Sequence, residues 1–255
     1  MNDLEYILDF AVNLGSQMLN TGANLERVND TMNRICLSYH LGDISIFSLN
    51  TTISLCAKSL EGETAVRQVS VAAASNHLEK LKQFNDLSRK VCAETPPPST
   101  LASLLAEAED VKEYPMWTIV LGYVTAMTCL CGIFGGGILD IVAVDLITVV
   151  LFWMIRILNK PNLNHIITNV LCMWIAGTLA ILMIRIGVGK QFFIIAITNS
   201  MMLIPGIPLV NATRNILCGN EMNGILEILK VILETAAIVL GLALSIYMFG
   251  GLIQW

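Results

Sequence analysis

The chain has 255 residues, of which 55% are hydrophobic and 14% charged, and its formal net charge is −5. The acidic balance excludes a nucleic-acid binder, because phosphate recognition needs a basic surface, and the apolar content excludes a disordered chain. The mean hydropathy of +0.68 is too high for an ordinary soluble domain. Residues 1–115 hold nine Lys/Arg and 15 Asp/Glu, whereas residues 116–255 hold six and five. The sequence therefore combines a polar N-terminal part with a C-terminal part suited to a lipid bilayer.

Residues 1–113 predict a small cytosolic α+β domain. An apolar repeat over residues 4–19 indicates an amphipathic helix that ends near Gly22, and Asn24 is placed to cap a second helix. A segment rich in Ile, Ser and Thr alternates like a strand, and its apolar phase changes near residue 50, which predicts a bulge or two short strands. The predicted elements are helices at 4–19, 24–39, 76–92 and 99–111, the last capped by Ser99, and strands within 44–57 and 64–71.

Residues 114–255 predict a domain of five membrane-spanning helices. A helix that crosses a bilayer needs ~20 predominantly apolar residues, at a rise of 1.5 Å per residue. Four segments satisfy this without an internal charge, and the second of the five is apolar but contains Asp140 and Asp145. The predicted spans are 116–134, 137–158, 166–184, 191–213 and 235–255, the last preceded by Glu227, Lys230 and Glu234 as an ion-paired helix start.

Lys and Arg in the short connections favour an N-terminus in the cytosol and a C-terminus outside. With this orientation, the connections on the inside carry four basic residues and those on the outside carry two. These residues are Arg156, Lys160, Arg214 and Lys230 inside, and Arg185 and Lys190 outside. We therefore expect a multi-pass protein of the cell membrane.

No motif of a familiar enzyme class is present in the sequence. The phosphate-binding loop GxxxxGK[ST] is absent, and so are HExxH and GxSxG. The three histidines, His40, His77 and His165, lie in three different predicted elements. The sequence therefore predicts no catalytic residues, no metal site and no cofactor.

The fourth predicted span contains Pro205-Gly206-Ile207-Pro208. Each proline removes a backbone donor and clashes with the carbonyl four residues earlier, so the helix is expected to break or kink here. In a bilayer the freed carbonyls are tolerated where they face protein or a wet cavity, and transporters use such broken helices to bind substrates. A kinked helix end at the cytosolic interface is the structural alternative. The transport interpretation gives the candidate pathway residues Asn199, Ser200, Pro205, Gly206, Pro208 and Asn211.

Asp140 and Asp145 are two further candidates for the pathway. A charge at the centre of a span costs roughly 2.5–3.5 kcal/mol on insertion scales, so such residues usually serve a function. Their separation of five residues places them on different faces of a helix, and they need not share a site. Asp145 lies mid-span, where a desolvated carboxylate could take up and release a proton; a hydrogen bond or a basic partner within the bundle is the alternative. Asp140 lies beside a Gly-rich turn, where an interfacial helix start is the alternative and water is expected to solvate the carboxylate.

Two stretches of the chain resemble the threonine/serine exporter family of bacterial membrane proteins. Residues 19–28, which include Gly22 and Glu26, are similar to a segment near the N-terminus of the family, and residues 204–212, followed by Gly219, are similar to its Pro-Gly-x-Pro segment. The resemblance implies a soluble domain followed by five spans. Family members occur as one chain of ten spans or as a long chain with a shorter partner of about five spans, and this chain resembles the long chain of the split form.

The function implied by the resemblance is secondary transport of a small polar metabolite out of the cell. The family's substrates include threonine and serine, and a split pair is implicated in the export of succinate. An odd number of spans also means that a second five-span unit would lie inverted in the membrane, an architecture common in transporters. Two alternatives remain open. One is a membrane-anchored regulator or scaffold without transport activity, and the other is an intramembrane enzyme that uses Asp140 and Asp145, against which their spacing argues.

Overall fold

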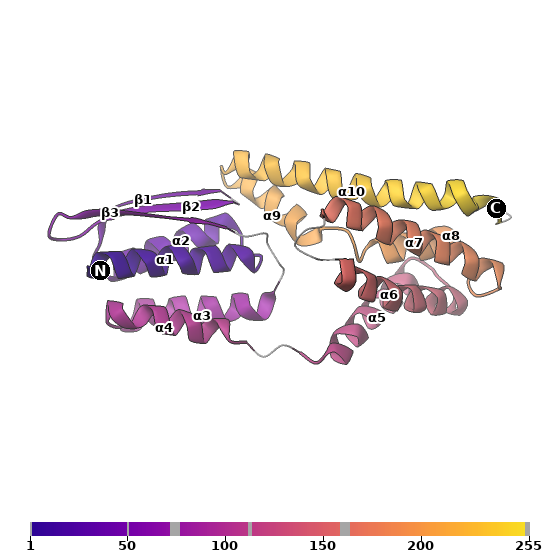
Figure 1. The fold of residues 1–255 in the computed structure, drawn as a ribbon, viewed down its shortest axis with the longest axis horizontal. Helices are drawn as coiled ribbons and strands as arrows, with labels where there is room; N and C mark the ends of the chain where they lie inside the picture. The colour runs from indigo at the N-terminus through magenta and orange to yellow at the C-terminus, as the bar shows by residue number, and fades with distance from the viewer. Residues whose placement is uncertain (1, 50, 72–76, 112–113, 159–163, 253–255) are drawn as a thin grey trace. The chain divides into compact units, whose positions relative to one another are not determined.

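The structure is a computed structural model that describes residues 2–49, 51–71, 77–111, 114–158 and 164–252. The chain divides into two compact units, which we describe separately. The polar unit comprises Met1–Lys112 and Ile207–Ile228, and the apolar unit comprises Glu113–Gly206 and Leu229–Trp255. Figure 1 labels the helices and strands of both.

The N-terminal part of the polar unit has three layers, a sheet, a helix pair and a second helix pair (Figure 1). The antiparallel sheet has the order β1-β2-β3, with Leu49 opposite Thr52 where the first two strands meet. The predicted strand segment 44–57 is therefore two strands, and a register irregularity lies between Gly42 and Ser45. The elements are α1 (Asp3–Asn20), α2 (Leu25–Ser38), β1 (Gly42–Leu49), β2 (Thr52–Lys58), β3 (Thr64–Ser70), α3 (Leu78–Glu94), the short η1 (Pro98–Thr100) and α4 (Leu101–Glu109).

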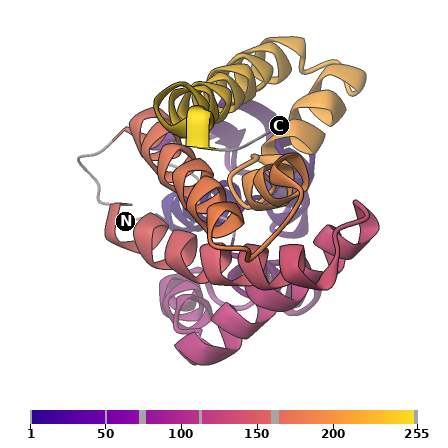
Figure 2. The ribbon, with the colours of Figure 1, turned by 90° about the vertical axis from the view of Figure 1, so that its right-hand side faces the viewer.

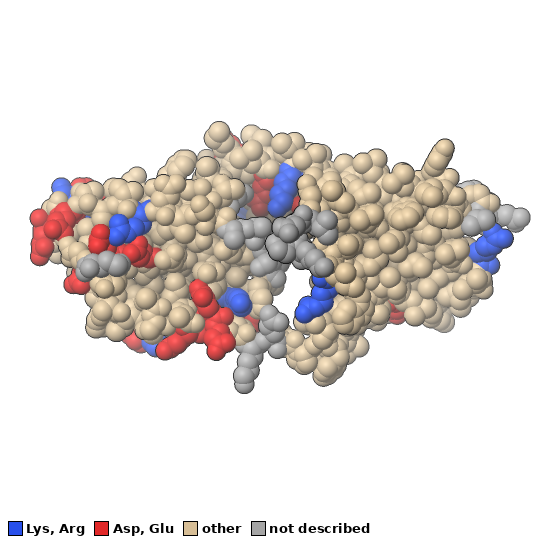
Figure 3. Space-filling model, in the orientation of Figure 1, with Lys and Arg blue, Asp and Glu red and all other residues tan. Residues whose placement is uncertain are grey.

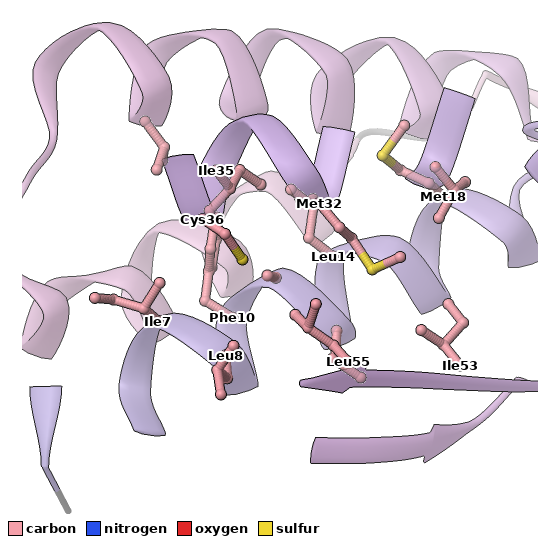
Figure 4. Packing of buried hydrophobic residues seen from close by; sticks show 14 of the residues in the cluster. Ile7, Leu8, Phe10, Leu14, Met18, Met32, Ile35, Cys36, Ile53 and Leu55 are labelled. Carbon is pink, nitrogen blue, oxygen red and sulfur yellow. The ribbon is translucent and has the colours of Figure 1, made fainter. Parts of the chain in front are cut away.

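The core of the polar unit extends through all three layers, from the sheet across α1 and α2 to Phe84 of α3 and Leu101 of α4. Figure 4 shows Leu8 and Leu14 of α1, Met32 of α2 and Leu55 of β2 among the side chains of this cluster. All four side chains are fully buried. The apolar repeat that predicts an amphipathic first helix therefore belongs to a central helix, which packs on the sheet and also on α2, α3 and α4.

Of two helix caps that the sequence predicts in this unit, the structure has one and differs at the other. The Asn24 side chain accepts a hydrogen bond of 3.0 Å from the backbone N–H of Arg27, so the predicted cap of α2 is confirmed. The predicted cap of the last helix at Ser99 is wrong, because Ser99 lies inside the η1 turn and Thr100 occupies the cap position of α4. Pro98 explains the difference, since its fixed φ favours a helical turn that starts one residue earlier.

The apolar unit is a helical bundle (Figure 2). Among the described residues, four helices are long and apolar enough to cross a membrane. The predicted count of five spans is therefore not confirmed. The four are α5 (Met116–Ile133), α6 (Ile138–Leu158), α7 (His165–Arg185) and α10 (Glu221–Phe249), and the shorter α8 (Phe192–Ser200) and η2 (Gly250–Leu252) complete the unit.

The predicted fourth span, 191–213, consists of two shorter helices, α8 and α9 (Gly206–Leu217). The helix breaks after Ser200, as the proline pair predicts, and α9 begins directly after Pro205. The nine residues of α8 extend about 14 Å at 1.5 Å per residue, roughly half of the ~30 Å hydrocarbon core. The broken helix is thus shorter on each side of the break than a membrane span.

The last helix begins 14 residues earlier than the predicted span 235–255. Glu227 and Lys230 lie inside α10, where Glu227 accepts a hydrogen bond from the Asn215 side chain and Lys230 lies 3.9 Å from Glu234. The charged turn that was interpreted as a helix start is therefore a polar segment within a longer helix. The predicted end of this span (253–255), the domain boundary at 113 and Lys160 lie outside the described residues.

Small residues bring α7 and α10 close together in the apolar unit. A Cβ atom added to Gly241 would lie 2.4 Å from the carbonyl oxygen of Val170, and one added to Gly177 would lie 2.2 Å from the Ser245 hydroxyl. Such close approach is a common way for helices to associate in membranes, where neighbouring lipid removes the hydrophobic driving force.

The surfaces of the two units differ in charge. Figure 3 shows acidic and basic side chains gathered over the N-terminal helices and strands, whereas the face over the helices of the apolar unit has few. Bulky apolar side chains of the latter are exposed, among them Trp117 at 69% and Trp153 at 47%. This distribution fits a polar unit in water and an apolar unit in lipid.

Candidate functional site

One face of α6 carries three polar side chains, those of Asp145, Thr148 and Arg156. Asp145, Thr148, Phe152 and Arg156 follow one another at intervals of three, four and four residues, which places them on one side of a helix. Thr148 and Phe152 are buried, whereas Asp145 is half-buried and Arg156 is exposed. This face therefore runs from a carboxylate in the middle of the helix to a guanidinium near its end.

Two hydrogen bonds link this face to neighbouring helices. The Thr128 hydroxyl of α5 donates to the Asp145 carboxylate at 2.8 Å, and the Thr148 hydroxyl donates to the side-chain oxygen of Asn199 in α8 at 3.2 Å. The amide nitrogen of Asn199 donates to the carbonyl of Ile195 at 3.0 Å. We call Thr128, Asp145, Thr148 and Asn199 the polar cluster. It brings together two predicted pathway residues, Asp145 and Asn199, with two threonines that the sequence analysis did not select.

A cavity lies beside the same face of α6. Its volume is about 340 Å³, and it is lined by Tyr123, Phe152, Ile155, Arg156 and Met202. Phe152 and Arg156 are one and two turns beyond Thr148, and Met202 follows Asn199 after three residues. The cavity thus continues the polar face towards a positive charge. Within the described part of the chain, Arg156 takes part in no ion pair.

Asp140 lies apart from the polar cluster and has a different environment. Its carboxylate accepts hydrogen bonds from the backbone N–H groups of Gly137 at 3.0 Å, Lys190 at 2.6 Å and Gln191 at 3.0 Å. The residue is only 2% exposed, so the expectation that water solvates it is wrong. By satisfying donors before α6 and before α8, Asp140 joins the starts of these two helices.

Four predicted pathway residues, Ser200, Pro205, Gly206 and Pro208, lie at the break between α8 and α9. The Ser200 hydroxyl donates to the carbonyl of Ile197 in its own helix at 2.7 Å. Pro205 precedes α9, Gly206 is its first residue and Pro208 lies in its first turn. A proline in the first turn leaves no hydrogen bond unmade, so Pro205 causes the break and Pro208 is compatible with the new helix.

The arrangement offers hydrogen-bonding groups inside an apolar bundle and an exposed cation beside the cavity. Among the described residues, no group of three or more His, Cys, Asp or Glu side chains could hold a metal ion. Polar side chains buried in such a bundle typically line the route of a polar solute.

The sequence profile of the ThrE family, described as "Putative threonine/serine exporter", matches residues 9–249. The chain belongs to the threonine/serine exporter family. It is a family of transporters, which agrees with the prediction that the chain is not an enzyme. The family assignment from residues 19–28 and 204–212 is therefore confirmed.

A curated relative gives a second likeness. The chain is 26% identical over 138 residues to the "Probable succinate transporter subunit YjjP" of Klebsiella aerogenes. The match covers 54% of this chain and 54% of the relative, so the chain spans about half the length of the curated relative it matches. No solved structure matches the chain.

The two stretches that resemble the exporter family contact each other within the polar unit. The Asn211 side chain of α9 donates to the carbonyl of Gly22 at 3.4 Å, and Arg214 donates to the Glu26 carboxylate through Nη2 at 3.1 Å. The Cys218 thiol, 3.3 Å away, donates to the same carboxylate oxygen. The predicted pathway residue Asn211 therefore lies at a contact between α9 and the N-terminal helices, separate from the polar cluster.

The electrostatics of this contact favour an ionised Glu26. The hydrogen bond from Cys218 and the guanidinium of Arg214 lower the pKa of the Glu26 carboxyl below its ordinary value. Both side chains of the ion pair are about half exposed. The helix that begins within the Pro-Gly-x-Pro segment, α9, is thus hydrogen-bonded to the N-terminal helices of the same unit.

Proposed function

We propose that this chain is a subunit of a secondary transporter of the cell membrane that exports a small amino acid or a small dicarboxylate such as succinate. The observation that carries the proposal is the polar cluster, since Thr128, Asp145, Thr148 and Asn199 join three helices inside an otherwise apolar bundle. Burying these groups in lipid would be costly without a function. The family assignment and the named relative support the same conclusion.

The cavity beside α6 supports a substrate that carries a carboxylate. Threonine, serine and succinate all have this group, and a guanidinium binds it by paired hydrogen bonds. Arg156 is placed to supply the guanidinium, and Tyr123 to supply a hydroxyl. Asp145, two to three turns earlier on α6, is the proposed proton carrier.

A partner subunit is part of this proposal. The relative is named as a subunit, and the bundle of this chain leaves large apolar side chains exposed on α5, α6 and α10. We propose a shorter membrane chain of the same family with about five spans. Two such chains would form the inverted pair in which transporters place their substrate site.

The proposed membrane domain is 114–255, and the proposed cytosolic domain is 1–113, with the N-terminus in the cytosol and the C-terminus outside. Four membrane crossings would place the C-terminus on the same side as the N-terminus, and five would place it on the opposite side. The location of the C-terminus therefore depends on whether the chain between α7 and α10 crosses the membrane. A C-terminus outside requires that α8 and the break cross the membrane together. A reporter that becomes active only in the periplasm or only in the cytosol, fused after Trp255, measures this directly.

Transport by purified protein tests the function. Proteoliposomes with both subunits, loaded with labelled threonine, serine or succinate, should release one of them when a pH gradient is imposed, whereas liposomes with either chain alone should not. Full export by this chain alone would contradict the need for a partner. Absence of any flux with both chains present would favour the anchored regulator.

Two neighbouring residues of α8 provide a matched pair for the same assay. Asn199→Ala removes a member of the polar cluster and should reduce flux, while Ser200→Ala removes a hydroxyl that bonds only within its own helix and should not. Pro205→Ala tests the break, because it permits a continuous helix. Loss of flux at normal protein abundance supports a role in the pathway, and loss of both together indicates a packing role.

A further inference from the structure

A second cavity lies between α2 and α3 in the polar unit. Its volume is about 360 Å³, within the range of roughly 300–1,000 Å³ found for small-molecule sites. Residues of both helices line it, and most of them are polar. The lining residues are Arg27, Asp30, Thr31, Arg34, Asn85, Ser88, Arg89, Cys92 and Ala93.

Three arginines and one carboxylate determine the charge of this cavity. The guanidinium of Arg34 pairs with Asp30 at 2.9 Å along α2. Within the part of the chain that the structure describes, neither Arg27 nor Arg89 takes part in an ion pair or a side-chain hydrogen bond. One unpaired guanidinium therefore comes from each of the two helices.

This concentration of positive charge contrasts with the rest of the domain. Residues 1–115 hold 15 acidic and nine basic residues, and three of those nine basic residues line the one cavity. An arginine without a carboxylate partner is unusual where carboxylates are in excess. The cavity is therefore the basic site of an acidic domain.

The floor of the cavity supplies no competing charge. Thr31, Asn85 and Ser88 are buried, and each donates a hydrogen bond to a backbone carbonyl of its own helix. Burial raises the pKa of the Cys92 thiol, so this side chain is neutral at neutral pH. The charged donors of the cavity that take part in no ion pair among the described residues are then the guanidiniums of Arg27 and Arg89.

We propose that the α2–α3 cavity binds a small dicarboxylate, with Arg27 holding one carboxylate and Arg89 the other. A guanidinium presents paired N–H donors that match the two oxygens of a carboxylate. Two such groups on opposite helices suit a ligand whose two charges are separated, in preference to a compact anion with a single centre. This site lies outside the transport pathway and is available to a cytosolic metabolite.

Isothermal titration of the purified full-length chain in detergent at low ionic strength tests this site. Succinate should bind with saturation, and the four-carbon monocarboxylate butyrate should bind roughly tenfold more weakly or not at all, because it leaves one guanidinium without a partner. A titration with inorganic phosphate in place of succinate distinguishes a dicarboxylate site from a phosphate site. Tighter binding of phosphate or equal binding of butyrate would overturn the assignment, and so would the absence of succinate binding.

Charge-removing variants locate the site. Arg27→Gln and Arg89→Gln should each weaken succinate binding roughly tenfold or more. Lys90→Gln is the matched control, because Lys90 is exposed on α3 beside Arg89 and does not line the cavity. Arg89→Lys keeps the charge but loses the paired geometry, and it should bind more weakly than the wild type. Circular dichroism and thermal unfolding of every variant confirm that the domain is folded.

The binding test is independent of transport. If the double variant Arg27→Gln/Arg89→Gln binds succinate as tightly as the wild type does, the dicarboxylate site lies elsewhere and the proposal fails. Failure of the flux assay described above would contradict the proposed function without affecting the titration.

Discussion

The two units of this chain are built in opposite ways. The polar unit buries large apolar side chains such as Leu8, Leu14 and Phe84 and exposes its charges. The apolar unit exposes tryptophans and leucines, and it buries Asp140 at 2% exposure and Asn199 at 1%. In the apolar unit, α7 and α10 approach each other closely at Gly177 and Gly241.

The difference follows from the solvent that each unit is suited to. In water, burying apolar area drives folding, so the interior of the polar unit is apolar. In lipid the same area gains nothing by moving inward, and helices associate through close packing and hydrogen bonds. A buried polar group therefore has a different meaning in the two units. In the polar unit it costs free energy unless it is hydrogen-bonded, whereas in the apolar unit its hydrogen bonds help to hold the helices together.

The largest effect is expected at Asp145 in the polar cluster. Asp145→Asn keeps the hydrogen bond from Thr128 but cannot take up a proton, so flux driven by a pH gradient should fall to the level of empty liposomes. Exchange of substrate for substrate should continue. Proteoliposomes with both subunits measure the two modes separately, and pH-driven export at the wild-type rate would remove Asp145 from the mechanism.

Asp140→Asn is the comparison for this experiment. An amide retains one acceptor oxygen where the carboxylate accepts from three backbone N–H groups, so about 1–3 kcal/mol of stability should be lost. We therefore expect lower abundance of the protein, with the flux per molecule less affected. Equal abundance of the two Asn variants would contradict the structural role of Asp140.

The core of the polar unit should be sensitive to the removal of volume. Leu14 is fully buried in α1, and Leu14→Ala should lower the local free energy of unfolding by about 2–5 kcal/mol through lost burial and a cavity. Leu60→Ala is the control, because Leu60 is 84% exposed and its truncation should change stability by less than about 0.5 kcal/mol. Amide hydrogen exchange of α1 in the full chain measures both.

The prediction for the apolar unit has the opposite sign, since added volume should be harmful. Gly241→Ala introduces a Cβ that would lie 2.4 Å from the Val170 carbonyl oxygen, and overpacking of this kind costs about 1–3 kcal/mol. Gly122→Ala in α5 has nothing within 4 Å and should be neutral or slightly stabilising. Thermal unfolding in detergent compares the two, and equal stability would show that α7 and α10 do not rely on this approach.

Local sequence signals predicted much of the fold. Apolar periodicity and the Asn24 cap gave α1 and α2, and Pro205 gave the break after α8. Each of these depends on residues within one or two turns of each other. The predicted start of α10 was wrong because Glu227, Lys230 and Glu234 are typical of a charged helix start before an apolar span. The hydrogen bond that Glu227 accepts from Asn215 comes from another helix and is not visible in the local sequence.

The candidate sites were predicted less completely because they are assembled across helices. Asp145 and Asn199 were recognisable as polar residues in apolar sequence, but Thr128 and Thr148 are ordinary residues of membrane helices until the fold pairs them. Arg27 and Arg89 are 62 positions apart, and only the packing of α2 on α3 places them around one cavity.

The smallest effect is expected at the contact between α2 and α9. Glu26→Gln removes the charge that pairs with Arg214, and because both groups are exposed the change should be modest. The folded-state pKa of Glu26 is lowered, first by the Cys218 hydrogen bond and then by Arg214, so the contact is fully stabilising above the ordinary carboxyl pKa and is lost as the pH falls through the lowered value. Amide exchange across α9 should therefore be faster in Glu26→Gln than in the wild type at pH 7, and the difference should shrink towards pH 4. Glu61→Gln, an exposed change without a side-chain partner among the described residues, is the control. An equal rate for wild type and Glu26→Gln at pH 7 would show that Arg214 does not hold α9 on the N-terminal helices.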